Sequence, residues 1–369
     1  MGTKKAIQEL RRNIALQRIA AKGFFKSLRL TQMPMTEPID FVVTWVDGND
    51  PAWRAEKAKY DPAYAKGNSD ARYRDWNQFM YWFRAVEKYA PWVRYVHLVT
   101  WGHLPPWLNT KHPKLKIVNH RDYIPEKYLP TFSSIPIELN IHRIPDLSEH
   151  FVYFNDDMLL AAPVQPKDFF EGGLPKHCAI ALPVRNYRYN GPFAHQLFSI
   201  VGLVNGYFDV YGSMEQHPEL WFHVAYGTEK RYNMNAFADA YLPGMYFSHL
   251  GVPLRKSTMC HTWEAFAAEL EKSSMQRFRT PLDIMHQIFS LWEIMSGTFV
   301  PVASDHYGVK FGALSKELSQ IEAAFSGEKY RMICLNDSVD VAEENFLTIK
   351  TELDRILENT FPEKSSFEE

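Results

Sequence analysis

The sequence predicts an α/β fold in which a mostly parallel sheet is flanked by helices and followed by a helical C-terminal part. From Ile39 onward, short β-branched or aromatic runs alternate with stretches of helical spacing, and after residue 260 helical spacing dominates. This alternation is typical of parallel sheets built from βαβ units. Hydrophobic residues make up 46% of the 369 residues, which is enough for a large core. We therefore expect a Rossmann-like sheet.

Each predicted strand is a short apolar run bounded by polar or turn residues: 40–46, 95–100, 116–118, 151–154 and 179–183. Between the first two strands, apolar residues recur at helical spacing from Phe79 to Tyr89, with Asp75 placed to cap this helix. Further helices are predicted at 135–144, 262–272, 282–296, 311–324 and 340–358. Residues 186–245 are rich in Tyr, Phe, Asn and Gly with weak periodicity, which predicts an irregular insertion over the sheet.

Three segments are expected: a basic N-terminal segment (1–36), a main α/β domain (37–338), and a C-terminal helix and tail (339–369). The first carries eight basic residues and one acidic residue, whereas the whole chain has a net charge of -2. Ile7, Leu10 and Ile14 share one helical face, so the segment is roughly amphipathic. It could make a peripheral contact with an anionic membrane, clamp a polyanionic polymer, or be a solvated leader helix.

Composition excludes several classes of protein. Lysine and arginine total 41 against 43 acidic residues, so the chain is not a generally basic nucleic-acid coat, and no nucleic-acid partner is expected. The longest apolar runs, such as 178–184, are far shorter than the ~20 residues that cross a bilayer. Three cysteines without CxxC spacing predict neither a disulfide framework nor a cysteine zinc site. A reducing cytoplasm fits this pattern, with the membrane's inner face as a peripheral location.

Four polar clusters follow the predicted strands, at the edge where open α/β sheets bind ligands. The first contains Thr44, Trp45, Asp47 and Gly48. It could present backbone amides and a cation-binding carboxylate to a phosphate. The alternative is an ordinary Asp-Gly turn.

The second cluster places Arg72 and Asp75 before the aromatic helix. Arginine at a helix N-terminus adds positive charge where backbone amides already favour an anion, so a diphosphate would suit this corner. Surface ion pairs are the alternative.

The third cluster is Asn155-Asp156-Asp157, which follows a strand that reads as buried. Adjacent carboxylates repel unless a divalent cation or arginines neutralise them, so Asp156 and Asp157 are candidate metal ligands. Upstream, Glu138 and His142 are four residues apart on a predicted helix, and an internal hydrogen bond is expected between them.

The fourth cluster is spread over the last third of the chain and includes His249, Arg255, Arg279 and Asn336. Histidine can act as a general base at neutral pH. Spacing alone does not select His249 among fourteen histidines.

Four strings in order, "IDFVVTWVDGNDPAW", "ARYRDWNQFMYWFRAVEKYAPWVRYVHLVTWGHLPPWLN", "LPTFSSIPIELNIHRIPDLSEHFVYFNDDM" and "ICLNDS", resemble the Stealth family of capsular polysaccharide phosphotransferases. That family is related to the catalytic part of animal N-acetylglucosamine-1-phosphotransferase. The resemblance implies a GT-A-like catalytic domain. It also implies transfer of a sugar 1-phosphate from a nucleotide-sugar donor, such as a UDP-sugar, to a glycan hydroxyl, with a phosphodiester formed and UMP released.

Matching motif positions imply catalytic roles for Asp157, His249 and Arg279, with Mg²⁺ as the expected cofactor and Asp156 and Asp157 as its candidate ligands. The resemblance assigns substrate binding to a larger set in the matched regions: Thr44, Trp45, Asp47, Gly48, Arg72, Asp75, Arg84, Ser133, His142, Arg143 and Asn336. A conventional glycosyltransferase, which attacks the sugar carbon of the same donor, and a polysaccharide-binding protein remain as alternatives.

Overall fold

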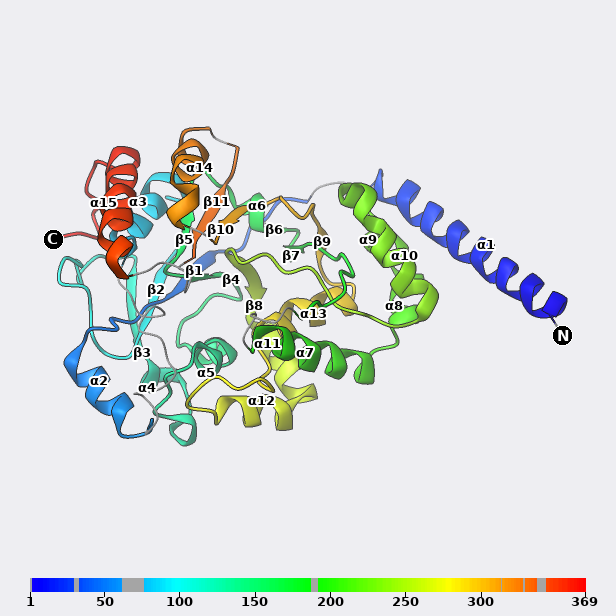
Figure 1. Ribbon diagram of the computed structural model, residues 1–369, viewed down its shortest axis with the longest axis horizontal. Helices are drawn as coiled ribbons and strands as arrows, with labels where there is room; N and C mark the ends of the chain where they lie inside the picture. The colour runs from blue at the N-terminus through cyan, green and yellow to red at the C-terminus, as the bar shows by residue number, and fades with distance from the viewer. Residues whose placement is uncertain are drawn as a thin grey trace.

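The computed structural model describes residues 2–29, 33–61, 76–186, 192–312, 314–327, 329–336 and 343–369, with the backbone alone for 2–9, 314–315 and 343–344. Its central sheet has the strand order β3-β2-β1-β4-β8 (Figure 1). The strands are β1 (Ile39–Thr44), β2 (Val96–Thr100), β3 (Leu115–Asn119), β4 (His150–Asn155) and β8 (Val252–Arg255). The first four are parallel, and β8 runs antiparallel to β4. The predicted Rossmann-like sheet is therefore confirmed.

The direction of chain winding changes at β1. The chain moves outward from β1 through β2 to β3 on one side, and β4 then pairs with the other side of β1. In open α/β sheets such a switch point forms a crevice at the carboxyl ends of the two strands. Here those ends are neighbours, because Thr44 of β1 is in register with Asn155 of β4.

Two small sheets complete the strand structure. One has the order β10-β11-β5, from β10 (Gly308–Phe311), β11 (Met332–Leu335) and β5 (Met158–Leu160). The other has the order β6-β7-β9, from β6 (Phe170–Glu171), β7 (Leu174–His177) and β9 (Val300–Pro301). The strand predicted at 179–183 is wrong: the extended segment that pairs is β7, and 178–186 has no assigned secondary structure.

Helices cover both faces of the central sheet (Figure 1). On one face α3 (Phe79–Tyr89), α14 (Leu314–Ser326) and α15 (Glu343–Thr360) pack against Phe41, Val43 and Phe154. On the other face lie α5 (Ser134–Leu139), α11 (Lys256–Ala265), α12 (Ala267–Ser274) and α13 (Gln287–Met295), packed against residues of opposite parity such as Val42 and Phe151. Burial on both faces explains why β1 and β4 are mostly apolar.

Residues 186–245 are not the irregular insertion that the sequence predicts. Outside 187–191, which lie beyond the described residues, they form α7 (Phe193–Tyr207), α8 (Val210–Gln216), α9 (Pro218–Trp221) and α10 (Lys230–Asp239). These helices bury aromatic side chains such as Trp221 and Phe237 together with a polar one, Asn233. Packing on several sides weakens the periodic pattern from which a helix is predicted.

Short helices complete the chain. They are α2 (Pro51–Ala58), α4 (His120–Tyr123) and α6 (Pro166–Phe169), together with 3-10 turns at Glu126–Tyr128, Ile141–Arg143 and Val224–Glu229. The basic N-terminal segment forms α1 (Gly2–Ser27), whose N-terminal part extends away from the body (Figure 1). No helix among the described residues is long and apolar enough to cross a membrane.

Arg84 anchors the C-terminus within the fold and is not placed to bind substrate. Its Nε and Nη2 donate to the two carboxylate oxygens of Glu368, both at 2.9 Å, and its Nη1 donates to the Phe361 carbonyl at 2.7 Å. Both side chains of the Arg84–Glu368 pair are buried. The substrate-binding role predicted for Arg84 is corrected because its guanidinium is already used by these partners.

Replacing Arg84 with Gln is expected to lower the free energy of unfolding by about 3–5 kcal/mol, because Glu368 would be left buried without its cation. Denaturant titration measures this. Arg355→Gln is the matched control, since Arg355 forms exposed ion pairs with Glu322 and Glu352 that solvent screens. An Arg84→Gln protein of normal stability with a raised donor KM would restore the substrate-binding role.

Candidate active site

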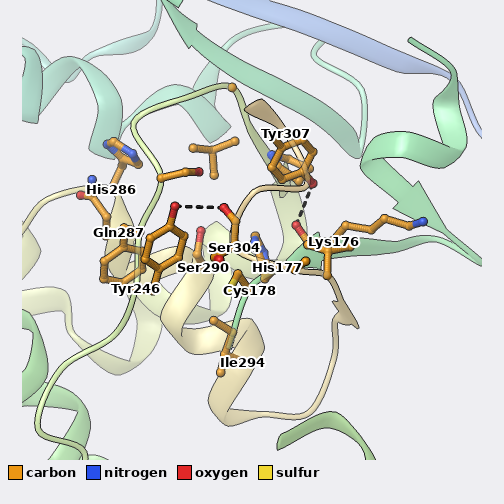
Figure 2. Close-up of a pocket in the computed structure, with 17 residues that line it drawn as sticks. Lys176, His177, Cys178, Tyr246, His286, Gln287, Ser290, Ile294, Ser304 and Tyr307 are labelled. Atoms are coloured by element: carbon orange, nitrogen blue, oxygen red, sulfur yellow. Dashed lines mark hydrogen bonds between the residues drawn. The ribbon is translucent and has the colours of Figure 1, made fainter. Parts of the chain in front are cut away.

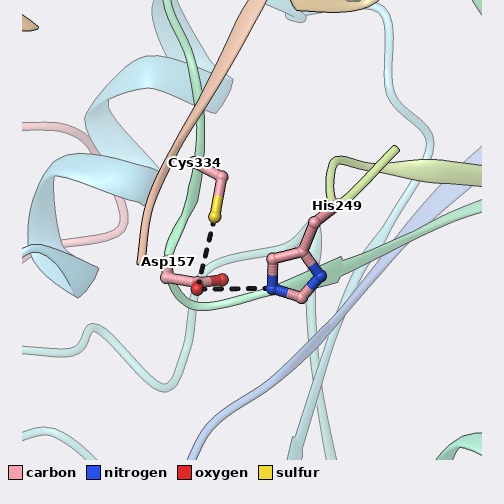
Figure 3. A group of neighbouring side chains, drawn as sticks. All are labelled: Asp157, His249 and Cys334. Carbon is pink, nitrogen blue, oxygen red and sulfur yellow. Dashed lines mark hydrogen bonds and ion pairs between the residues drawn. The ribbon is translucent and has the colours of Figure 1, made fainter. Parts of the chain in front are cut away.

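Three segments distant in sequence place a carboxylate, an imidazole and a thiol together at the carboxyl end of β4 (Figure 3). Asp157 lies in the turn between β4 and β5, Cys334 lies in β11, and His249 lies in the loop before β8. Pairing of β11 with β5 sets Cys334 beside the turn, and pairing of β8 with β4 returns the His249 loop to the same edge. Asp157 and His249, predicted as catalytic residues, are therefore neighbours.

Asp157 is held by polar contacts on one carboxylate oxygen. Its Oδ2 accepts from Asn336 Nδ2 at 3.2 Å and from the Cys334 thiol at 3.4 Å, and it lies 3.7 Å from His249 Nε2. Burial alone would raise the pKa of Asp157, but His249, Asn336 and the thiol together lower it below its usual value. Asp157 is thus a carboxylate at neutral pH.

The second oxygen of Asp157, Oδ1, is buried and has no hydrogen-bond partner among the described residues. A buried carboxylate oxygen is normally hydrogen-bonded, so this unpaired atom is a candidate ligand for a substrate hydroxyl or a cation. His249 is about one-third exposed, so the same corner is open to solvent.

The donor atoms of Asp157, His249 and Cys334 lie within 4.8 Å of one another, but they do not form a complete Mg²⁺ site. Burial and the nearby Asp157 raise the pKa of the Cys334 thiol well above its ordinary value, and a thiol is not the oxygen ligand that Mg²⁺ prefers. Mg²⁺ prefers oxygen ligands and is commonly bound by one or two carboxylates plus substrate phosphates. Asp157 fits that role through Oδ1.

Gly251 lets the His249 loop approach the sheet. A Cβ atom at this position would lie 2.5 Å from Cε1 of Phe154, whose ring is fully buried in β4. Because real Cβ atoms do not come this close, a side chain at residue 251 would push the loop away from β4.

Gly251→Ala is expected to lower kcat at least about tenfold, since misplacing a reacting group by ~1 Å can cost 10²-fold. Steady-state kinetics measure the loss, and the additional change Phe154→Leu should recover part of it. Gly202→Ala is the control, because a Cβ there meets no atom within 4 Å. Normal kcat in a folded Gly251→Ala protein would show that the loop position does not set the rate.

A second, buried polar network lies beneath this edge. Tyr153 Oη donates to Asn155 Oδ1 at 2.6 Å or to Glu138 Oε1 at 3.2 Å, and lies 3.2 Å from Thr44 Oγ1. The other oxygen of Glu138 is 2.7 Å from His286 Nδ1. Burial would raise the pKa of Glu138, but His286 and Arg279 lower it to about 2. Thr44 is therefore at the predicted edge, as part of a network with Glu138, His286 and Tyr153.

Arg279 is exposed beside this network and donates to Ser134 Oγ at 2.7 Å. The preceding residue, Ser133, is buried and caps α5 by accepting from the amide of Ile135. Arg279 therefore presents a cation near the amino end of α5, where a phosphate could be bound.

The expected Glu138–His142 hydrogen bond is wrong. Helix α5 ends at Leu139, so the two residues do not share a helix face, and Glu138 instead pairs with His286. His142 is buried against Trp263, and Arg143 Cζ lies 5.0 Å from the Trp263 ring. Burial, Arg143 and Lys256 together lower the pKa of His142 to about 3. Lys256 directly follows Arg255, which pairs with His150 at the amino end of β4. The structure therefore places His142 and Arg143 away from the carboxyl edge.

The first predicted cluster lies at the carboxyl end of β1. Trp45 stacks on Phe79 with ring centroids 5.5 Å apart, and the amide of Asp47 donates to His103 Nε2 at 2.8 Å. Asp47 Oδ1 accepts from the amide of Asn49, which makes 47–49 a turn through Gly48. Trp45 is thus chiefly a packing residue, and the Asp47 carboxylate is partly used by its own turn. Arg72 and Asp75 lie outside the described residues.

A large cleft of about 720 Å³ opens at the carboxyl ends of β2 and β3. Its lining includes Tyr60, Trp101, Asn119, His120 and Thr131, and Thr131 immediately precedes the segment that carries Ser133 and Ser134. The cleft therefore adjoins the Arg279 corner. The sequence already indicated this cleft, since Trp101 and Asn119 each directly follow a predicted strand.

A second cavity lies behind the His249 loop, between Tyr246, His286 and Tyr307 (Figure 2). Its volume is about 50 Å³, whereas small-molecule sites usually measure ≈ 300–1,000 Å³. Hydrogen bonds from Tyr246 to the Ser304 carbonyl and from Tyr307 to the Lys176 carbonyl hold its walls. It has room for water but not for a sugar.

The fold and the residues at the carboxyl edge of the central sheet define an α/β enzyme with a carboxylate–imidazole pair and a nearby arginine. Comparison with known protein families gives matches to Stealth protein CR1, conserved region 1, over residues 37–65 and to Stealth protein CR2, conserved region 2, over residues 72–177. These regions include β1, β4 and Asp157.

Similar proteins extend the likeness over most of the chain. The capsular polysaccharide phosphotransferase WcwK of Streptococcus pneumoniae is 39% identical over 342 residues, which cover 90% of this chain and 100% of the relative. The receptor polysaccharide phosphotransferase WefC of Streptococcus gordonii is 41% identical, with 90% and 100% covered. The exopolysaccharide phosphotransferase cps2G of Lactiplantibacillus plantarum is 37% identical, with 89% and 96% covered. The chain belongs to the Stealth family, and it is a sugar-phosphate transferase.

Proposed function

We propose that this enzyme transfers a hexose or N-acetylhexosamine 1-phosphate from a UDP-sugar to a hydroxyl of a glycan acceptor. The role is in capsular or cell-surface polysaccharide synthesis, as the names of its relatives suggest. The observation that carries the proposal is the Asp157–His249 pair, open to solvent at the switch-point edge. Three free cysteines support a cytoplasmic location.

The reaction joins the acceptor oxygen to the phosphorus that bears the sugar. The bond from that phosphorus to the bridging oxygen of the diphosphate breaks, and UMP leaves with the bridging oxygen. The acceptor hydroxyl loses its proton to the imidazole of His249, at Nδ1, because Nε2 is the nitrogen that faces Asp157. Asp157 stabilises the imidazolium that forms.

Negative charge on the transferring phosphoryl group needs cations in the transition state. Arg279 supplies one fixed positive charge near the amino end of α5. Mg²⁺, held through Asp157 Oδ1 with Asp156 nearby, would supply Lewis-acid stabilisation when bound.

The cleft at the carboxyl ends of β2 and β3 is the proposed nucleotide site. Trp101 and Tyr60 line it and can stack on a base, and Asn119 and Thr131 can form hydrogen bonds with it. Trp101→Ala is expected to raise the donor KM about tenfold, since a stacked base contributes ~1–3 kcal/mol. The acceptor KM should stay unchanged. A donor KM that does not change would place the nucleotide elsewhere.

Product analysis tests the proposed reaction. The full-length enzyme is incubated with Mg²⁺, a glycan acceptor and a panel of nucleotide sugars. UMP and a phosphodiester signal in the ³¹P NMR spectrum of the glycan are the expected products. UDP together with a new glycosidic bond would show a conventional glycosyltransferase instead. Binding of the glycan without turnover of any donor would show a polysaccharide-binding protein.

A further inference from the structure

Helix α1 has a packed face and an outward face. Leu16, Gly23 and Ser27 are buried, and the helix packs against α9 and α10. A Cβ atom on Gly23 would lie 2.2 Å from the Pro218 carbonyl oxygen, so the close approach to α9 requires glycine. Lys26 pairs with Glu219 at 2.9 Å. The orientation of the helix about its own axis is therefore fixed.

The outward face carries an apolar stripe that nothing among the described residues covers. Leu10, Ile14, Phe25 and Leu28 are 60%, 43%, 63% and 56% exposed. At the helical advance of ~100° per residue Leu10, Ile14 and Phe25 fall within one narrow sector ~22 Å long, and Leu28 lies in the turn directly after the helix. Isolated exposed apolar residues are ordinary, but a row along one helix marks an interaction surface.

A basic row runs beside the apolar stripe. Arg11, Arg18 and Lys22 are exposed and follow one another at helical spacing, rotated by ~100° from the apolar stripe, and Arg29 is exposed in the turn after the helix. No acidic residue occurs between Leu10 and Thr36. The stripe and the row together face away from α9 and α10.

We propose that this outward face of α1 binds an anionic lipid bilayer, with the apolar stripe inserted at the headgroup boundary and the basic row on the lipid phosphates. An amphipathic helix with these two features lies in the plane of a membrane surface. The anionic surface is the occupant because it neutralises the basic row. A second copy of the chain on this face would instead oppose two rows of like charge. The proposal is independent of the reaction described above.

Co-sedimentation of the full-length protein with vesicles tests it. Strong binding is expected with phosphatidylcholine vesicles that contain phosphatidylglycerol, and weak binding with phosphatidylcholine alone. Raising the salt concentration should release the protein, because ions screen charges at a surface. Equal binding to both kinds of vesicle, or binding to neither, would overturn the proposal.

Three sets of substitutions locate the surface. R11Q/R18Q/K22Q should lower the partition coefficient at least about tenfold, since each basic residue near an anionic surface contributes the equivalent of a ~5-fold change. L10S/I14S/F25S should also lower it, and neither set touches the packed face. R54Q/K111Q/K272Q removes three exposed charges elsewhere and should bind normally. Equal loss in this control would overturn the proposal, as would a dimer that the apolar set converts to monomers.

Discussion

Asp157→Asn is expected to lower kcat by about 10²–10³ or more, while the protein keeps its fold. Asparagine has nearly the same shape and can still accept from Asn336, but it lacks the charge that stabilises a protonated His249 or holds a cation. Asp157 is ionised in the native site, because its polar neighbours lower its pKa despite its burial. Substitution therefore removes a charge that is present during turnover.

Steady-state kinetics measure the loss of kcat, and thermal melting shows whether the protein keeps its fold. Asp305→Asn, a change of the same kind at an exposed position, is the control and should have normal kcat. EDTA titration of the wild-type enzyme shows whether a divalent cation is needed. Near-normal turnover by Asp157→Asn would remove Asp157 from the mechanism, whatever the EDTA result.

The sheet could be predicted from sequence because its central strands β1 and β4 are buried on both faces. β1 and β4 are mostly apolar runs that end in polar residues, so both the strands and the edge with Thr44, Asn155 and Asp157 followed from pattern alone. Helices α7 to α10 could not be predicted in this way. Their buried aromatic and polar residues give little periodicity, because they pack on several sides.

Partners distant in sequence could not be predicted from spacing. Glu138 and His142 have the spacing of a helical pair, yet the helix ends between them and the partner of Glu138 is His286, 148 residues further along the chain. Arg84 lies in a matched family region, but its side chain points toward the C-terminal residues rather than the edge. A motif identifies a segment, whereas packing decides which of its side chains reach the site.

Spacing along the sequence also could not select His249 as a site residue. Fourteen histidines are present, and only the resemblance to the Stealth family selected this one. The structure adds the physical reason: β8 pairs antiparallel with β4 and Gly251 permits contact with Phe154, so the loop brings His249 to the Asp157 turn.

His249→Ala is expected to lower kcat by about 10²–10⁴, the range for loss of a general base. Donor affinity should change little, because the cleft proposed for the nucleotide lies at β2 and β3 while the His249 loop lies beside β4. Ser248→Ala, a change of the adjacent loop residue, is the control. Since His249 is partly exposed, added imidazole can enter the space left by the substitution and is expected to restore part of the rate.

Rescue by imidazole shows which of two residues, His249 or Asp157, accepts the proton from the acceptor hydroxyl. If His249 accepts the proton, imidazole should accelerate His249→Ala in proportion to its unprotonated fraction and leave Asp157→Asn unchanged, since that variant retains its own imidazole. If Asp157 is the base and His249 only positions it, imidazole will not accelerate His249→Ala. Asp157 Oδ1, buried without a hydrogen-bond partner among the described residues, would then be the atom that receives the proton.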